Sequence, residues 1–192
     1  MDEDGTDQVA QALRHNYVYY PASVFPRTKR TFGNAILSKW PLSQPGKILL
    51  PYRGLNNQQL RIAVRGMVTI DDLEVATYSV HTETYTVPPR HRKAQIAAVV
   101  DDIGPGNGYA VAGGDFNTVS NRSIKRMVGQ FAQFGLVRAS KGAGPTVSKF
   151  GLKPSAADHI FARGLTVLEA GKIDPISASD HFPVWVKLTP SG

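Results

Sequence analysis

The chain has 192 residues, of which 42% are hydrophobic and 19% charged, and it carries a formal net charge of +7 at pH 7. This length and composition predict one globular domain over residues 1–192, large enough to bury a core. The absence of cysteine excludes disulfides, thiolate metal sites and a cysteine nucleophile. No stretch reaches the roughly 20 apolar residues of a transmembrane helix. No cleavable leader is visible either, so we expect a soluble protein that is cytoplasmic by default.

The excess positive charge is grouped along the chain. Three basic groups stand out: Arg27/Lys29/Arg30, Arg90/Arg92/Lys93 and Arg122/Lys125/Arg126. A positive face favours anionic partners, such as nucleic acid, phosphorylated lipid or a membrane surface. The alternative interpretation is a basic surface that serves only solubility.

The predicted elements begin with a helix, because Val9, Ala12 and Leu13 have helical spacing, and Thr6 is its expected N-cap. Strand-like runs follow at 17–20, 35–40, 60–70 and 73–80, the last two forming a hairpin across 71–72. A helix over 90–103, a buried strand at 109–112, a helix over 124–134, a loop over 141–157 and strands near 159–161, 165–168 and 182–188 complete the series. Antiparallel pairs mixed with strand–helix–strand passages predict an α/β (α+β) fold whose sheets are covered by helices.

Unusual polar residues occur where these strands begin or end. His81 follows the apolar run LEVATYSV, and Asp115 and Asn117 follow YAVAGG. Asp158 opens the strand DHIF, and the pair 180–181, an aspartate and a histidine, precedes FPVWVKL. Each of these has an ordinary explanation as a turn former or a solvated side chain. Strand ends in packed sheets meet at a common rim, however, so the whole set indicates a site.

The chemistry of this set is coherent. Asp115 and Asn117 alternate on a strand-like segment, so we expect their side chains to point the same way while Phe116 enters the core. Asp158 and His181 are expected to form a carboxylate–imidazole dyad. The run 179–181 cannot form a serine-hydrolase relay, because adjacent side chains diverge. The histidines lack zinc-site spacing, and oxygen-rich ligands favour Mg²⁺ or Mn²⁺.

At these residues the sequence resembles the endonuclease/exonuclease/phosphatase superfamily, which includes the deoxyribonuclease I and exonuclease III types. The resemblance rests on GNAILSKWPL (33–42), the strand ending in His81, RKAQ (92–95), GGDFN (113–117), DHIF (158–161) and SDHFPV (179–184). It implies a four-layer sandwich of two mixed β-sheets flanked by helices. It also implies metal-dependent cleavage of phosphate esters by water.

The resemblance assigns roles to individual residues. Asp115 would hold or deprotonate the attacking water, and Asn117 would bind the scissile phosphate or orient that water. His181, paired with Asp158, would contact the phosphate and stabilise its developing charge, and His81 would hydrogen-bond the phosphate or the leaving oxygen. Asp180 would assist in positioning the metal or the histidine. The expected lining of the substrate cleft is Asn34, Thr146 and Arg92, although Arg92, with Gln95 one helical turn away, is also placed to brace the loop after His81.

The chain departs from the family pattern at its start. Family members begin with a strand ending in Asn, followed by a strand ending in Gln-Glu, whose Glu is the principal metal ligand. The first residues here, MDEDGTDQVAQAL, resemble the segment just after that Glu. We therefore expect a domain that is incomplete at its N-terminus, with Glu3 or Asp2 as substitute ligands. We also expect an exposed sheet edge or core face that a homo-oligomer or another chain would cover.

Three functions are compatible with these features. The first is divalent-metal-dependent hydrolysis of phosphate esters by a nuclease that cleaves DNA or RNA with little sequence specificity. The second keeps the mechanism and replaces the substrate by a phospholipid or an inositol phosphate, a choice that we expect to depend on the loops 43–59, 82–89 and 141–157. The third is a catalytically impaired remnant that binds nucleic acid.

Overall fold

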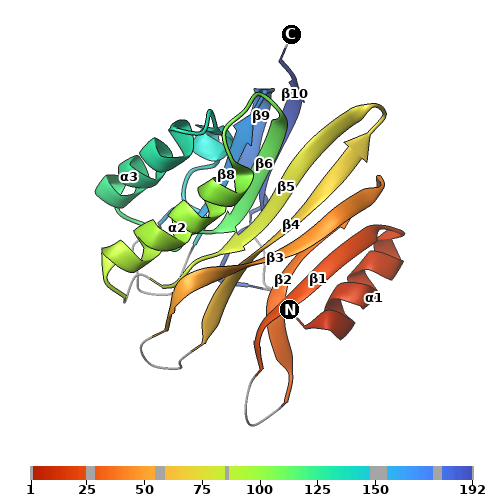
Figure 1. The fold of residues 1–192 in the computed structure, drawn as a ribbon, viewed down its shortest axis with the longest axis horizontal. Coiled ribbons are helices and arrows are strands. Elements are labelled where there is room, and N and C mark those ends of the chain that lie inside the picture. The colour runs from red at the N-terminus through yellow and green to blue at the C-terminus, as the bar shows by residue number, and fades with distance from the viewer. Residues whose placement is uncertain are drawn as a thin grey trace.

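The structure is a computed structural model that describes residues 2–24, 29–54, 59–84, 87–147, 155–174 and 179–191. Arg27 and parts of the loops 43–59, 82–89 and 141–157 lie outside these residues. The elements in chain order are α1 (Glu3–Leu13), β1 (Asn16–Val24), β2 (Thr31–Ser38), β3 (Leu42–Arg53), β4 (Leu60–Ile70), β5 (Leu73–His81), α2 (Pro89–Ile103), β6 (Tyr109–Asp115), α3 (Asn121–Ala132), β7 (Val137–Arg138), a 3₁₀ turn η1 (Ala139–Ala143), β8 (Asp158–Arg163), β9 (Leu165–Lys172) and β10 (Val184–Pro190) (Figure 1).

A six-stranded mixed sheet forms the centre of the fold, with the strand order β3-β4-β5-β6-β8-β7. Its antiparallel β4–β5 hairpin turns between Ile70 and Leu73, as the sequence predicts. The β5–β6 pair is parallel, and α2 makes the crossover between these strands. Because β5 and β6 run the same way, their carboxyl ends lie at the same edge of the sheet.

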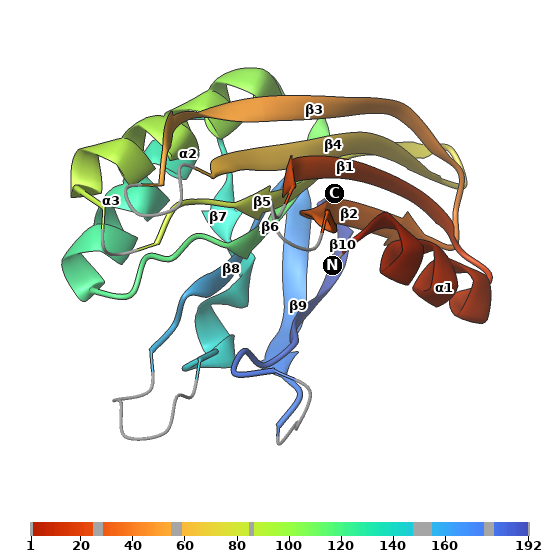
Figure 2. The same cartoon turned by 90° about the horizontal axis from the view of Figure 1, so that it is seen from below.

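Helices α2 and α3 cover one face of this sheet, and two hairpins cover the other (Figures 1 and 2). The core under the helices contains Val99 of α2, Phe131 of α3 and Phe161 of β8, all with no exposed surface. On the other face β1–β2 packs against β4 and β5, β10 packs against β8, and α1 packs outside β1–β2. A large mixed sheet flanked by helices confirms the predicted fold class.

The second sheet layer differs from the expectation of one mixed sheet. Among the described residues it consists of two separate antiparallel hairpins, β1–β2 and β9–β10. A groove of about 980 Å³ lies between them, and its walls include Ile36 of β2 and Leu188 of β10. Its floor includes Val68, Val75 and Val111 of the central sheet. Part of the apolar sheet face is therefore left open here.

Local signals explain where the sequence prediction of the elements fails. Helix α1 is capped by Asp2, whose Oδ1 accepts a hydrogen bond of 3.0 Å from the N–H of Gly5. Thr6 was therefore the wrong N-cap: it lies inside the first turn, and its hydroxyl donates to the backbone carbonyl of Asp2. Strand β3 falls in the predicted loop 43–59, because two register shifts against β4 interrupt its alternation. In the described part of the chain, no helix has the length and apolar character needed to cross a membrane.

Candidate active site

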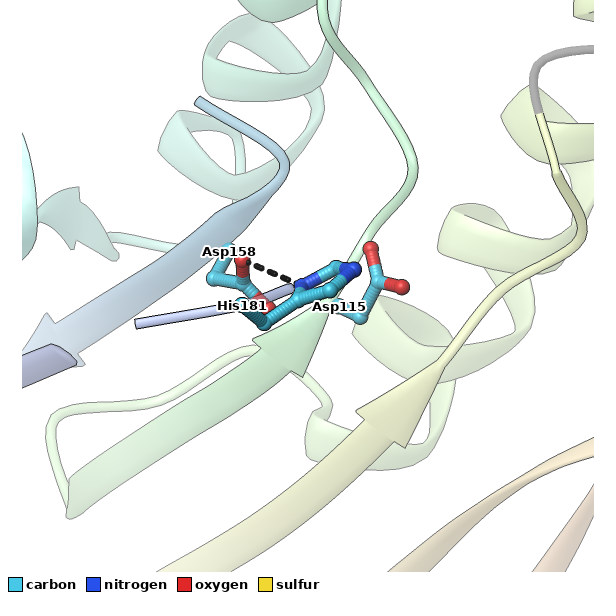
Figure 3. Close-up of side chains that lie close together, drawn as sticks. All are labelled: Asp115, Asp158 and His181. Carbon is cyan, nitrogen blue, oxygen red and sulfur yellow. Dashed lines mark hydrogen bonds and ion pairs between the residues drawn. The ribbon is translucent and has the colours of Figure 1, made fainter. Parts of the chain in front are cut away.

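Three of the predicted site residues lie in one row across the central sheet. In the strand register His81 of β5 is paired with Asp115 of β6, and Asp115 is paired with Asp158 of β8. His181 joins this row because it forms a bridge with Val147, in the loop before β8. The structure thus brings Asp115, Asp158 and His181 together (Figure 3).

His181 and Asp158 form a dyad. The Nδ1 atom of His181 lies 2.9 Å from Oδ2 of Asp158. This hydrogen bond is the main reason that the pKa of His181 is raised. The hydrogen bond fixes Nδ1 as the protonated nitrogen when the ring is neutral. Figure 3 shows the other ring nitrogen on the side of Asp115.

Thr146 holds the carboxylate of this dyad. Its hydroxyl donates to Oδ2 of Asp158 at 2.7 Å and accepts hydrogen bonds of 3.0 Å from the backbone N–H groups of Ala157 and Asp158. The side chain is buried, at 1% exposure. Thr146 is therefore a positioning residue for Asp158, and the structure assigns it no place on an open cleft surface.

Asp115 and Asn117 meet through a turn and not through the strand alternation that we expected. Strand β6 ends at Asp115, and Asn117 has a left-handed backbone with φ of 47°, a conformation that asparagine tolerates. Oδ1 of Asp115 accepts the backbone N–H of Asn117 at 2.8 Å, and Oδ2 accepts its Nδ2 at 3.1 Å. Phe116 is fully buried, as predicted.

Glycine is required at one position of this segment. Gly114 has a φ of 149°, and a Cβ atom there would lie 1.9 Å from the carbonyl oxygen of Val80. No other residue fits without moving β5 and β6 apart. The close approach of these two strands sets Asp115 beside His81.

Asp115 is an unusual carboxyl group. Burial, followed by the negative charge of Asp158, raises its pKa to about 6. Two carboxylates in one poorly solvated site repel each other, and a bound cation relieves that repulsion. Asp115, Asp158 and His181 offer ligand atoms that all lie within 4.8 Å of one another. Mg²⁺ commonly uses one or two protein carboxylates together with substrate phosphates, so the two carboxylates of this set suit Mg²⁺ or Mn²⁺.

His81 is held neutral by burial and, second, by Arg61, a neighbour that the sequence analysis missed. Arg61 of β4 lies with Nη1 3.0 Å from Nε2 of His81. Burial, followed by the charge of Arg61, lowers the pKa of His81 to about 3. Arg61 in turn pairs with Glu83 at 2.5 Å, with side-chain exposures of 9% and 5%. The available signal was an arginine inside the otherwise apolar run LRIAV.

Two predicted substrate residues instead hold the backbone. Asn34 is buried, and its Nδ2 donates to the carbonyl oxygens of Ile62 and Ser79, which ties β2 to the central sheet. Arg92 is also buried and donates to the carbonyl oxygens of Thr84 and Val87. Arg92 thus braces the loop after His81.

Two predicted metal residues stand apart from the ligand group. Glu3 is exposed in the first turn of α1, and it has no atom in the group formed by Asp115, Asp158 and His181. Asp180 is also exposed and outside that group. The charge of Asp180 nevertheless contributes to the raised pKa of His181.

The fold and the site define a class of α/β sandwich proteins whose polar groups gather on one rim of a mixed sheet. The chain belongs to the endonuclease/exonuclease/phosphatase family, because the sequence model of that family matches residues 2–181. Members of this family are generally phosphoester hydrolases and typically depend on a divalent metal ion. A curated relative, a UPF0294 protein of Vibrio cholerae serotype O1, is 31% identical over 121 residues, or 62% of this chain. The chain covers 41% of that relative's length.

Solved structures share the fold at low sequence identity. A family member from Leptotrichia buccalis has a TM-score of 0.77 and 17% identity over 97% of this chain and 78% of its own. TDP2 of D. rerio, complexed with a single-strand DNA product, has a TM-score of 0.75 and 16% identity over 98% and 83% of the two chains. The mannosyl-6-phosphatase Bt3783 of Bacteroides thetaiotaomicron has a TM-score of 0.71 and 18% identity over 95% and 80%.

Proposed function

We propose that this protein hydrolyses phosphodiester bonds of DNA or RNA with the help of Mg²⁺ or Mn²⁺. The observation that carries the proposal is the group formed by Asp115, Asp158 and His181, whose ligand atoms lie within 4.8 Å of one another. The net charge of +7 supports an anionic polymer as substrate. The single-strand DNA product bound to the similar TDP2 structure supports nucleic acid in particular.

Each residue has a part in the proposed reaction. Water attacks phosphorus, and Asp115, which lies beside the dyad, accepts its proton. The phosphorus–oxygen bond to the leaving group breaks, and that oxygen takes a proton from Nε2 of His181. Asp158 stabilises the charged imidazole through its 2.9 Å hydrogen bond. A divalent ion held by Asp115 would stabilise negative charge on the phosphate.

His81 and Arg61 form the opposite side of the proposed phosphate site. His81 stays neutral at physiological pH, because its pKa is about 3, so it acts as a hydrogen-bond donor and not as an acid. Arg61, whose charge is balanced by Glu83, orients the ring of His81 through the contact with its Nε2 atom. Fixed donors and charges of this kind stabilise developing negative charge without reorganising during the reaction, and removal of one typically costs roughly 10²–10³-fold in rate.

A panel of substrates tests the proposal. Purified protein is incubated with single-stranded DNA, plasmid, RNA, bis-p-nitrophenyl phosphate and phosphorylated inositol lipids, each with Mg²⁺, Mn²⁺ or EDTA. We expect EDTA-sensitive cleavage of nucleic acid that Asp115→Asn abolishes. The matched control is Asp101→Asn, a charge-identical change at an exposed position of α2.

The other outcomes select among the alternatives. Cleavage of the inositol lipids alone would replace the nuclease proposal by the lipid phosphoesterase. The phosphatase among the similar structures makes a phosphomonoester control worthwhile. Salt-sensitive binding of nucleic acid without any hydrolysis would favour the catalytically impaired remnant.

A further inference from the structure

A groove of about 570 Å³ lies between α2 and α3, on the helical face of the molecule. The two helices pack against each other. The residues that line it include Arg90, Lys93 and Ile96 of α2 and Arg126 and Met127 of α3. Helices α2 and α3 are separated in the chain by β6, so the groove forms only when the fold places the two helices side by side.

The charge of this groove is positive. Arg90 and Lys93 of α2 and Arg126 of α3 are exposed and line it, so the fold brings Arg126 next to a basic group that is distant from it in the sequence. Helix α3 contains no acidic residue. The nearest acid of α2 in sequence after Lys93 is Asp101, eight residues on, which at 1.5 Å per residue is about 12 Å along the axis.

The groove is lined by residues that lie close in sequence to the candidate active site. Thr118, which lines it, directly follows Asn117 in the chain. Pro89, at the other wall, ends the loop that starts at His81. Because β5 and β6 are parallel, the helices that follow them both start at the edge of the sheet where His81 and Asp115 lie.

The shape of the groove discriminates between anionic partners. Its cations stand along both sides, and its floor contains Ile96 and Met127, which are only 3% and 1% exposed. A membrane surface needs apolar side chains that protrude and insert, and these two do not protrude. An extended strand needs no such insertion, because its phosphates can lie along the cations on the two sides.

We infer that the α2–α3 groove binds the backbone of a single nucleic-acid strand as it leaves the active site. This inference rests on the proposed function, since it identifies which part of the surface receives the substrate beyond the cleaved bond. Arg90, Lys93 and Arg126 contact phosphates without reading bases. Binding there is therefore independent of sequence and sensitive to salt.

A matched pair of double variants tests the groove. Lys93→Gln/Arg126→Gln removes two cations that line it. The control, Arg122→Gln/Lys125→Gln, removes one arginine and one lysine from exposed positions of α3 that do not line it. Each is combined with Asp115→Asn so that the strand is not cut. Anisotropy of a labelled single-stranded oligonucleotide of about 20 nucleotides then gives the dissociation constant at several salt concentrations.

We expect the groove variant to bind about 10-fold more weakly or worse, and the slope of log K against log salt to fall by about 1.4, or roughly 0.7 per lost phosphate contact. The control should bind within about twofold of the parent. Equal weakening in both variants would overturn the inference, because it would reduce the effect to overall charge. If the groove variant lost more affinity for phosphatidylserine vesicles than for the oligonucleotide, the inference would be overturned in favour of a lipid surface.

Failure of this inference is distinguishable from failure of the proposed function. Without Asp115→Asn, the groove variant should hydrolyse bis-p-nitrophenyl phosphate at the wild-type rate, because that substrate is too small to reach the groove. If the groove variant lost oligonucleotide binding while no form of the protein hydrolysed any substrate, the groove inference would be supported and the nuclease proposal rejected. Thermal melting of each variant checks that exposed substitutions leave the fold intact.

Discussion

Replacement of Glu83 by Gln is expected to cost about 3 kcal/mol of unfolding free energy. Its partner Arg61 is almost fully buried, and the pair is joined at 2.5 Å with side-chain exposures of 9% and 5%. Removing one member of a buried ion pair typically costs about 3–5 kcal/mol, because the other charge stays buried without compensation. Glutamine retains an acceptor, which places the expected cost at the lower end. Glu74→Gln, at an exposed position of β5, should change stability by less than about 0.5 kcal/mol.

Urea unfolding of the single and double variants measures this directly. In a cycle with Arg61→Met, the interaction energy should reach on the order of 2 kcal/mol, because each single variant strands its partner and the double variant strands neither. Additive single costs, or a cost below about 1 kcal/mol for Glu83→Gln, would refute the idea that this ion pair supports the site. The same Arg61→Met variant should raise the pKa of His81 above its value of about 3, as followed by NMR. Burial alone should still keep this pKa below 6.5.

Three further results are expected. Thr146→Val should cost about 1–3 kcal/mol, since it leaves the N–H of Asp158 unpaired in a buried site, and it should lower kcat with little change in KM. Unfolding in denaturant would show no cost if water replaced the hydroxyl. Asn34→Leu should destabilise by about 2 kcal/mol through the loss of two bonds to backbone carbonyls, whereas a residue that only binds substrate would leave the melting temperature unchanged. Burial lowers the pKa of His159 to about 4. As the pH falls, the unfolded chain therefore protonates at this histidine before the folded chain does. Its stabilising contribution, about 3 kcal/mol, is complete above pH 6.5 and disappears as the pH falls through 4. His159→Phe should flatten stability against pH over this range, and an unchanged slope would contradict the assignment.

The sequence predicted those features that depend on local signals. The β4–β5 hairpin follows from two apolar runs joined at 71–72, and α2 follows from one apolar face ended by Gly104. The rim of polar residues was predictable because β5, β6 and β8 carry His81, Asp115 and Asp158 at their ends. The hydrophobic period of each segment and the position of polar residues at the strand ends were sufficient to predict the hairpin, the helix and the rim.

Other features depend on contacts between distant segments. The pairing of Arg61 with Glu83 is set by how β4 lies against β5 and the loop after it, which a single sequence does not specify. Asn117 reaches Asp115 through a left-handed turn, whereas the alternation pattern predicted an extended strand. Strand β3 contains Pro45 and Gly46, residues that are typical of loops, so the sequence predicted a loop there. Pairing with β4 nevertheless holds this segment in the sheet.

The most direct test of the account is the rate of phosphodiester hydrolysis as Mn²⁺ is added to EDTA-treated protein. We predict no cleavage without metal, a rate that saturates with Mn²⁺, and a loss of at least about 10²-fold in both Asp115→Asn and Asp158→Asn. Asp101→Asn should follow the wild-type curve. Cleavage that persists in EDTA, or that survives both active-site substitutions, would contradict the assignment of this rim as the hydrolytic site.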